Sequence, residues 1–169
     1  MKNIFYVIIL FVLSMMLFGC MQKNTADIAD ISDDFICNAE IKYKDITASA
    51  KITRAQTRIY EIELTSPSHL KDFKLSYDNG TVNVSYKGFK INLGEENKSL
   101  ESIPKILADT MDSLVSGVEF NTNEKEGDVT IQGNNSNYDY NAVVDIKNMQ
   151  LKSLEIPSQE LKCDFYDFK

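Results

Sequence analysis

The chain of 169 residues is poor in the side chains on which most enzyme sites depend, since it has a single histidine and three cysteines. His69 follows Ser66 and Ser68 in an expected loop, but neighbours in sequence do not form a catalytic triad. The sequence contains no Gly-x-Ser-x-Gly turn and no glycine-rich phosphate loop. The carboxylates are scattered, with no spacing that favours an acid–base pair. We interpret His69 as a solvated loop residue and expect that the protein is not an enzyme.

Metal ligands are equally scarce. The cysteines lack the paired spacing of a zinc site. The acidic residues Asp27, Asp30, Asp33 and Asp34 lack the glycine and the bidentate glutamate of a calcium loop, so a solvated leader is favoured. We expect no metal, and no cofactor other than the covalent lipid described below.

Positive charge is also in short supply: 18 Lys and Arg residues stand against 25 Asp and Glu residues, which gives a net charge of −7. Such acidity disfavours binding to nucleic acid through phosphate neutralisation. The sequence also lacks a Lys/Arg cluster that would hold the protein against anionic lipid. Membrane attachment is therefore expected to depend on hydrophobic groups.

A long apolar run occurs once, at the N-terminus. Residues 4–18 follow Lys2 and lead into Leu17-Phe18-Gly19-Cys20, where a small residue and a thiol stand as they do in a lipobox. At roughly 15 residues the run is short for a spanning helix, which needs about 20. This pattern favours a lipoprotein signal peptide; an uncleaved anchor with a chance Gly-Cys pair is the alternative.

We expect residues 1–19 to be removed, Cys20 to carry diacylglycerol and fatty acid such as palmitate, and residues 20–33 to form a flexible polar tether. Two or more acyl chains give stable anchoring. The mature protein is then extracytoplasmic, lipid-anchored to the membrane of a bacterial envelope, and we expect it to be a monomer. Residues 34–169 form its single domain.

From Asp34 onward apolar residues recur at every second position, which predicts strands with one buried and one wet face. The Asn79-Gly80 pair between two such runs is a strong hairpin indication, because both residues tolerate positive φ. The expected strands are 35–43, 48–52, 60–64, 73–77, 82–86, 89–93, 118–120, 129–131, 138–146, 151–156 and 161–168.

The rhythm changes once, over residues 102–116, where the apolar spacing is helical. Ser102 is a suitable N-cap, Pro104 lies in the first turn, and Gly117 suits the C-terminal end. The apolar stripe of this expected helix comprises Ile103, Ile106, Leu107, Met111, Leu114 and Val115.

A flat sheet of roughly ten strands would be nearly 50 Å wide, since strands lie about 4.8 Å apart. A helix of about 15 residues is near 22 Å long and cannot cover it. We therefore predict a mainly β (α+β) fold: a single curled antiparallel sheet, forming an unclosed β-barrel or half-barrel, with one amphipathic helix packed in its mouth. Such folds fill their interior with side chains or enclose an apolar cavity.

Residues on the expected apolar face are candidates to line that cavity, although an ordinary core is the alternative for each of them. The candidates are Tyr60, Ile62, Phe73, Leu75, Val84, Tyr86, Phe89, Ile91, Ile106, Met111, Phe120, Tyr138 and Tyr140.

Cys37 and Cys163 lie on apolar faces near opposite ends of the domain. An extracytoplasmic location permits a disulfide between them. A free cysteine, however, behaves as a small core side chain, and this reading stays open.

The layout of lipobox, tether, one-faced sheet and single helix resembles the lipoprotein-carrier (LolA/LolB-like) superfamily. The local similarity lies in Thr65-Ser66-Pro67, Leu70-Lys71-Asp72-Phe73 and Val84-Ser85-Tyr86-Lys87-Gly88-Phe89. The resemblance implies an unclosed barrel with helices in its mouth, and binding of lipid or of an acyl chain.

Two functions follow as hypotheses. The first is a cell-surface lipoprotein that binds a hydrophobic ligand, a lipid or another lipoprotein's acyl chain, in the concave face of the sheet. The alternative is a non-enzymatic interaction module with a filled core, which acts through its outer face or a sheet edge. A sensor of envelope state is a third, weaker option. Occupation of the interior by the protein's own side chains discriminates between the first two.

Overall fold

The computed structural model describes residues 34–55, 59–78, 80–92, 103–115, 121–125, 127–135 and 137–169. The expected signal peptide, Cys20, the tether and Phe120 lie outside these residues. In the described ranges no helix is long and apolar enough to cross a membrane.

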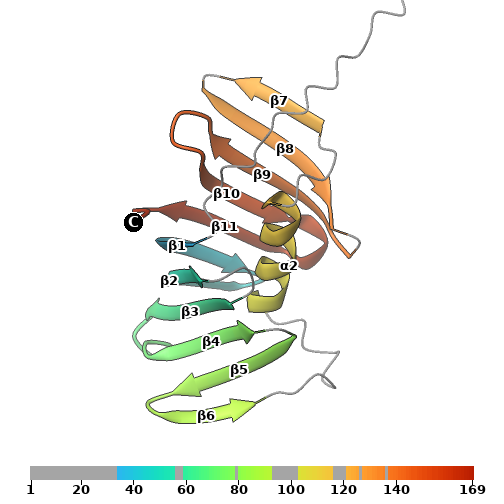
Figure 1. The fold of residues 1–169 in the computed structure, drawn as a ribbon. Coiled ribbons are helices and arrows are strands. Elements are labelled where there is room, and N and C mark those ends of the chain that lie inside the picture. The colour runs from blue at the N-terminus through green and yellow to red at the C-terminus, as the bar shows by residue number, and fades with distance from the viewer. Residues whose placement is uncertain are drawn as a thin grey trace, which may run out of the picture.

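One open antiparallel sheet of eleven strands forms the fold, in the order β6-β5-β4-β3-β2-β1-β11-β10-β9-β8-β7. The single described α-helix, α2, lies across the middle of the sheet (Figure 1), and a short 3-10 helix, η2 (Pro157–Gln159), follows β10. This confirms the predicted mainly β, unclosed architecture. The elements are β1 (Phe35–Tyr43), β2 (Ile46–Ala55), β3 (Ile59–Ser66), β4 (Phe73–Asp78), β5 (Thr81–Tyr86), β6 (Phe89–Asn92), α2 (Ile103–Val115), β7 (Asn121–Lys125), β8 (Asp128–Asn134), β9 (Asp139–Asp145), β10 (Gln150–Ile156) and β11 (Leu161–Tyr166).

The first and last strands are neighbours in the centre of the sheet. Strand β1 pairs with β11 from Asn38 opposite Tyr166 to Tyr43 opposite Leu161. Beyond the last strand, Lys169 and Ile36 exchange backbone hydrogen bonds of 2.9 and 3.4 Å. Residues 34–169 thus contain every described element, including both strands of the central β1–β11 pair.

Two expected local features are confirmed, and one lies outside the described residues. Gly80 has a φ of 91° between β4 and β5, as a tight hairpin requires. Helix α2 spans 103–115 and buries four residues of its predicted stripe, Ile106, Leu107, Met111 and Leu114, while Ile103 is half-buried. The expected strand 118–120 falls on residues that are not described. The neighbouring strand β7 spans Asn121–Lys125 and carries the polar sequence Asn-Thr-Asn-Glu-Lys, which the apolar pattern did not predict. An edge strand of this kind pairs through its backbone, which the apolar pattern does not report.

The core lies between α2 and the face of the sheet that α2 covers, here called the inner face. Its opposite is the outer face. Strand β1 illustrates the pleat, because Cys37, Ala39 and Ile41 are at most 3% exposed on the inner face while the residues between them are less buried. The core cluster takes its members from both halves of the sheet and from α2.

Candidate functional site

The centre of the inner face is filled by the protein's own side chains. Six of the predicted cavity residues lie in one buried cluster beneath and along α2, each at most 5% exposed. This part of the interior is therefore a packed core rather than an open cavity. The six are Tyr60, Ile62, Ile106, Met111, Tyr138 and Tyr140.

A buried cation joins α2 to the sheet. Arg54 on β2 is 3% exposed; its Nε donates to the Tyr60 hydroxyl at 2.7 Å and its Nη2 donates to Asp112 Oδ1 at 3.1 Å. The Tyr60 hydroxyl in turn donates to the same carboxylate oxygen at 2.8 Å. Burial, and then the Asp112 charge, raise the pKa of Tyr60 well above its usual range, so the phenol stays a donor.

Sequence reasoning missed Arg54. Arg54 continues the inner-face alternation of β2 after Ala50 and Ile52, so the sequence pattern itself places it on the apolar face. A charge at such a position needs a buried partner, and Asp112 on the polar side of the helical stripe supplies it.

On the other side of α2, hydroxyls and amides make the connection. Ser113 Oγ lies 3.2 Å from the Tyr140 hydroxyl, and Asn135 Nδ2 donates to Thr110 Oγ1 at 3.0 Å. Tyr140 lies flat against Gly133, where an added Cβ would come within 2.4 Å of the ring. Glycine at this position lets the ring reach Ser113, and α2 is fixed to both halves of the sheet.

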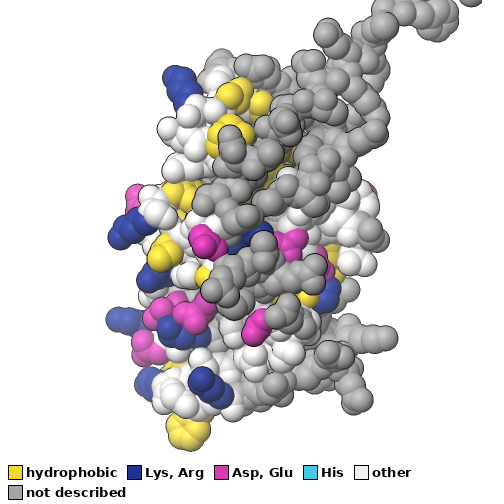
Figure 2. All heavy atoms as spheres, in the orientation of Figure 1, with side chains coloured by type: hydrophobic (Ala, Val, Ile, Leu, Met, Phe, Trp, Pro, Cys, Tyr) yellow, Lys and Arg dark blue, Asp and Glu magenta, His cyan; other side chains and the backbone are white. Residues whose placement is uncertain are grey.

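The strands β4, β5 and β6, here called the β4–β6 wing, continue the apolar inner face. Helix α2 contacts β4, and among the described residues the wing becomes more exposed toward β6. Phe73 lies opposite Tyr86, which lies opposite Phe89, and the rings of Phe73 and Tyr86 stack with centroids 4.4 Å apart. Phe89 is 78% exposed. In the orientation of Figure 1, Figure 2 shows hydrophobic surface at the lower end of the molecule, over β6.

A second inner-face row of the wing places Leu75, Val84 and Ile91 opposite one another. Leu75 and Val84 are half-buried, and Leu75 packs against the edge of the core. The structure thus divides the predicted lining residues into a filled centre and a partly open wing. Phe120 lies outside the described residues, and the Ile91 side chain is not described.

Of the two readings left open for Cys37 and Cys163, the structure shows the free cysteines. Both cysteines are free and buried. Cys163 lies opposite Ile41, and Cys37 stands four positions further along β1, roughly 13 Å away at about 3.3 Å per residue. A disulfide needs Cα atoms closer than about 7 Å. Burial raises the pKa of the Cys37 thiol to about 12, so both cysteines behave as the small core side chains of the alternative reading.

Within the described part of the chain, no group of three or more His, Cys, Asp or Glu side chains could hold a metal ion. The single described histidine, His69, lies in the turn between β3 and β4, with Ser66-Pro67 in the cis form before it.

Comparison with known proteins gives similar folds and no matching sequence family. No family model and no curated protein matches the chain. The structure is similar to a DUF1329 family protein from Desulfovibrio piger, with 12% identity, a TM-score of 0.47 and coverage of 85% of this chain and 88% of that one.

It is also similar to a LolA superfamily protein from Nitrosomonas europaea (12% identity, TM-score 0.43, coverage 87% and 90%). A third similar chain belongs to the structure of the CwlD amidase from Clostridioides difficile in complex with the GerS lipoprotein (15% identity, TM-score 0.49, coverage 82% and 87%). These similarities concern the fold alone.

Proposed function

We propose that the protein is a lipid-anchored extracytoplasmic lipoprotein that binds an apolar chain, a fatty acyl group of a lipid or lipoprotein, on the inner face of the β4–β6 wing. The observation that carries this proposal is the cross-strand row of Phe73, Tyr86 and Phe89, which lies on the inner face outside the core cluster and leaves Phe89 78% exposed. Exposed apolar surface of this kind marks binding sites in soluble domains.

The wing suits a long, narrow apolar ligand. Its two rows run across three strands, with aromatic rings at one row and aliphatic side chains at the other. The charged residues of β4, such as Lys74, belong to the outer face, where Lys74 pairs with Glu61 and Glu63 at 3.1 and 3.2 Å. An acyl chain laid along the rows would therefore meet apolar atoms without displacing these ion pairs.

The first test is native mass spectrometry on Met21–Lys169, which contains every described element, purified without detergent. We expect a lipid or fatty acid to co-purify at one equivalent, and Tyr86→Ser with Phe89→Ser to remove it. Tyr166→Ser is the matched control, because Tyr166 is 45% exposed and belongs to the outer face. A protein that stays free of ligand after addition of fatty acids and phospholipids would contradict the proposal.

The anchor is tested separately with Cys20→Ser in the full chain. The change should abolish metabolic labelling with palmitate and leave unprocessed precursor, because the acylated thiol is gone. Labelling that persists would remove the lipoprotein assignment while leaving ligand binding by the wing untouched.

The filled centre favours a second candidate function, an interaction module that acts through a sheet edge or the outer face. Strands β6 and β7 each have one neighbour in the sheet, so each has an edge that can accept a further strand. If the protein is such a module, the native mass spectrometry experiment should find it free of ligand even after fatty acids and phospholipids are added.

A further inference from the structure

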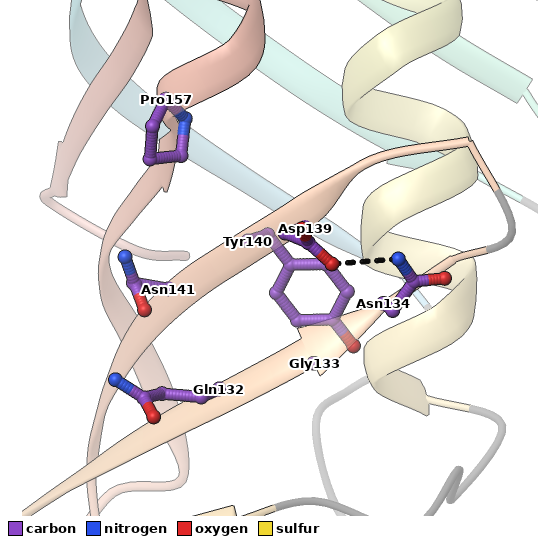
Figure 3. Close-up of a pocket in the computed structure, with 7 residues that line it drawn as sticks. All are labelled: Gln132, Gly133, Asn134, Asp139, Tyr140, Asn141 and Pro157. Atoms are coloured by element: carbon purple, nitrogen blue, oxygen red, sulfur yellow. Dashed lines mark hydrogen bonds between the residues drawn. The ribbon is translucent and has the colours of Figure 1, made fainter.

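The outer face of β8 and β9 carries a polar hollow that the proposed function does not use. It has a volume of ≈ 450 Å³, within the range of about 300–1,000 Å³ typical of small-molecule sites. Four of its side chains form a two-by-two array, because Gln132 lies opposite Asn141 and Asn134 lies opposite Asp139. Figure 3 shows the array, with α2 behind the two strands and Pro157 beside it.

The array offers hydrogen-bonding groups that the protein leaves open. Asn134 Nδ2 donates to Asp139 Oδ1 at 2.7 Å, which orients both side chains. In the described residues neither the Gln132 nor the Asn141 amide has a hydrogen-bond partner. Each amide supplies two donor hydrogens and an acceptor oxygen, and Asp139 retains acceptor capacity.

These groups restrict the chemical class of the ligand. No Lys or Arg is found among the described residues that line the hollow, so nothing there compensates the charge of an anionic ligand. Apart from Pro157 and the Tyr140 ring, which faces the core, the lining offers little surface to an acyl chain. The hollow therefore suits a neutral ligand that presents donors and acceptors together.

A peptide strand fits this place less well. Peptides bind sheets by pairing with a free edge, whereas β9 already pairs with β8 and with β10, and β8 also pairs with β7. Hydroxyl-rich rings need only side-chain groups of the kind in the array. We propose that this hollow is a binding site for a neutral saccharide.

The test is calorimetric titration of the full chain, in a zwitterionic detergent without a sugar headgroup, with N,N′-diacetylchitobiose. We expect saturable binding with a Kd below about 1 mM. Gln132→Ala and Asn141→Ala should each raise the Kd about fivefold, as loss of one net hydrogen bond does, and the double variant should raise it further than either single change. Thr130→Ala, on the outer face of β8 but outside the hollow, is the matched control and should bind as the parent does.

A measurement without substitutions accompanies it: the side-chain amide resonances of Gln132 and Asn141 should shift in ¹⁵N NMR spectra as the saccharide is added. No saturable heat, an unchanged Kd in the double variant, or shifts confined to other residues would overturn the proposal. Tighter binding of acetyl-trialanine amide than of the saccharide would overturn it in favour of a peptide site. The array is on the outer face of the sheet, whereas the proposed acyl-chain site is on the inner face of the β4–β6 wing. None of these results therefore bears on acyl-chain binding.

Discussion

The centre of the inner face and the β4–β6 wing have the same apolar alternation but differ in what covers them. In the centre, Tyr60 and Ile62 are 1% exposed beneath α2, whereas Phe89 in the wing is 78% exposed. Helix α2 contacts β3 and β4 in one half of the curled sheet and β8 in the other, whereas Phe89 lies on β6 at the end of the strand order. The position of one helix therefore decides which part of a uniform apolar face becomes core and which part stays exposed.

The two regions also differ in what fixes them. The centre combines apolar packing with the polar contacts of Arg54, Asp112 and Tyr60 across α2. The wing is joined to the rest of the sheet through the β3–β4 pairing, and α2 reaches it at β4. We therefore expect stability to depend on the centre and ligand binding to depend on the wing.

The largest effect should come from the helix residue at the middle of the core. Ile106 is 0% exposed, and Ile106→Ala should lower the free energy of unfolding by about 2–5 kcal/mol, since it leaves a cavity that rigid neighbours fill only partly. Urea unfolding measures it. A loss below about 1 kcal/mol would show that α2 is not part of the core.

Removing the carboxylate that faces Arg54 should have the next largest effect. Asp112→Ala leaves a cation whose side chain is 2% exposed without this partner, and we expect a loss of about 2–3 kcal/mol. Arg54→Met in the same background should recover part of it, because the buried charge is gone. A double-mutant cycle measures the coupling, and strict additivity would contradict the proposed role of the pair.

Alkaline pH should weaken the centre in a defined window. The pKa of Cys37 is raised from 9.0 to about 12, so between these values the folded state retains a proton that the unfolded state loses. The contribution of the buried thiol to the free energy of unfolding is fully present below pH 9. Between pH 9 and pH 12 it falls by about 1.4 kcal/mol per pH unit for each such thiol. Urea unfolding at pH 8, 9 and 10 measures the slope, and Cys37→Ala should reduce it. An equal slope in the variant would exclude this thiol as the cause.

The smallest effect should be found in the wing. Phe89→Ala removes a side chain that already contacts water, so the free energy of unfolding should change by less than about 0.5 kcal/mol. Acyl-chain binding should nevertheless weaken in the same protein. A stability loss comparable to that of Ile106→Ala would mean that the wing belongs to the core, and the contrast between the regions would fail.

The strand pattern and the helix were largely predictable from the sequence, and the division of the inner face was not. Alternation at Cys37, Ala39 and Ile41 reports that one face is apolar, but it does not report whether α2 reaches that face. The same limit applies to the disulfide, because the register that places Cys163 opposite Ile41 depends on a pairing of strands from opposite ends of the chain.

Polar residues were the other gap. Arg54 and Asp112 lie 58 positions apart and become partners only when α2 crosses the sheet. The outer-face array of Gln132, Asn134, Asp139 and Asn141 resembles any wet strand face in the sequence. Its hollow depends on the position of Pro157 after β10, which no periodicity reports.

The pairing of β1 with β11 sets an order of events for the growing chain. Asn38 Nδ2 donates to Asp167 across 129 positions, so the middle of the sheet is completed by residues that are made long after β1. The segments on either side of α2 can form hairpins early, but they meet only when β11 arrives. Until then β1 and β10 each present an unpaired edge, and a chain cut before residue 161 would lack the strand that joins the two halves of the sheet.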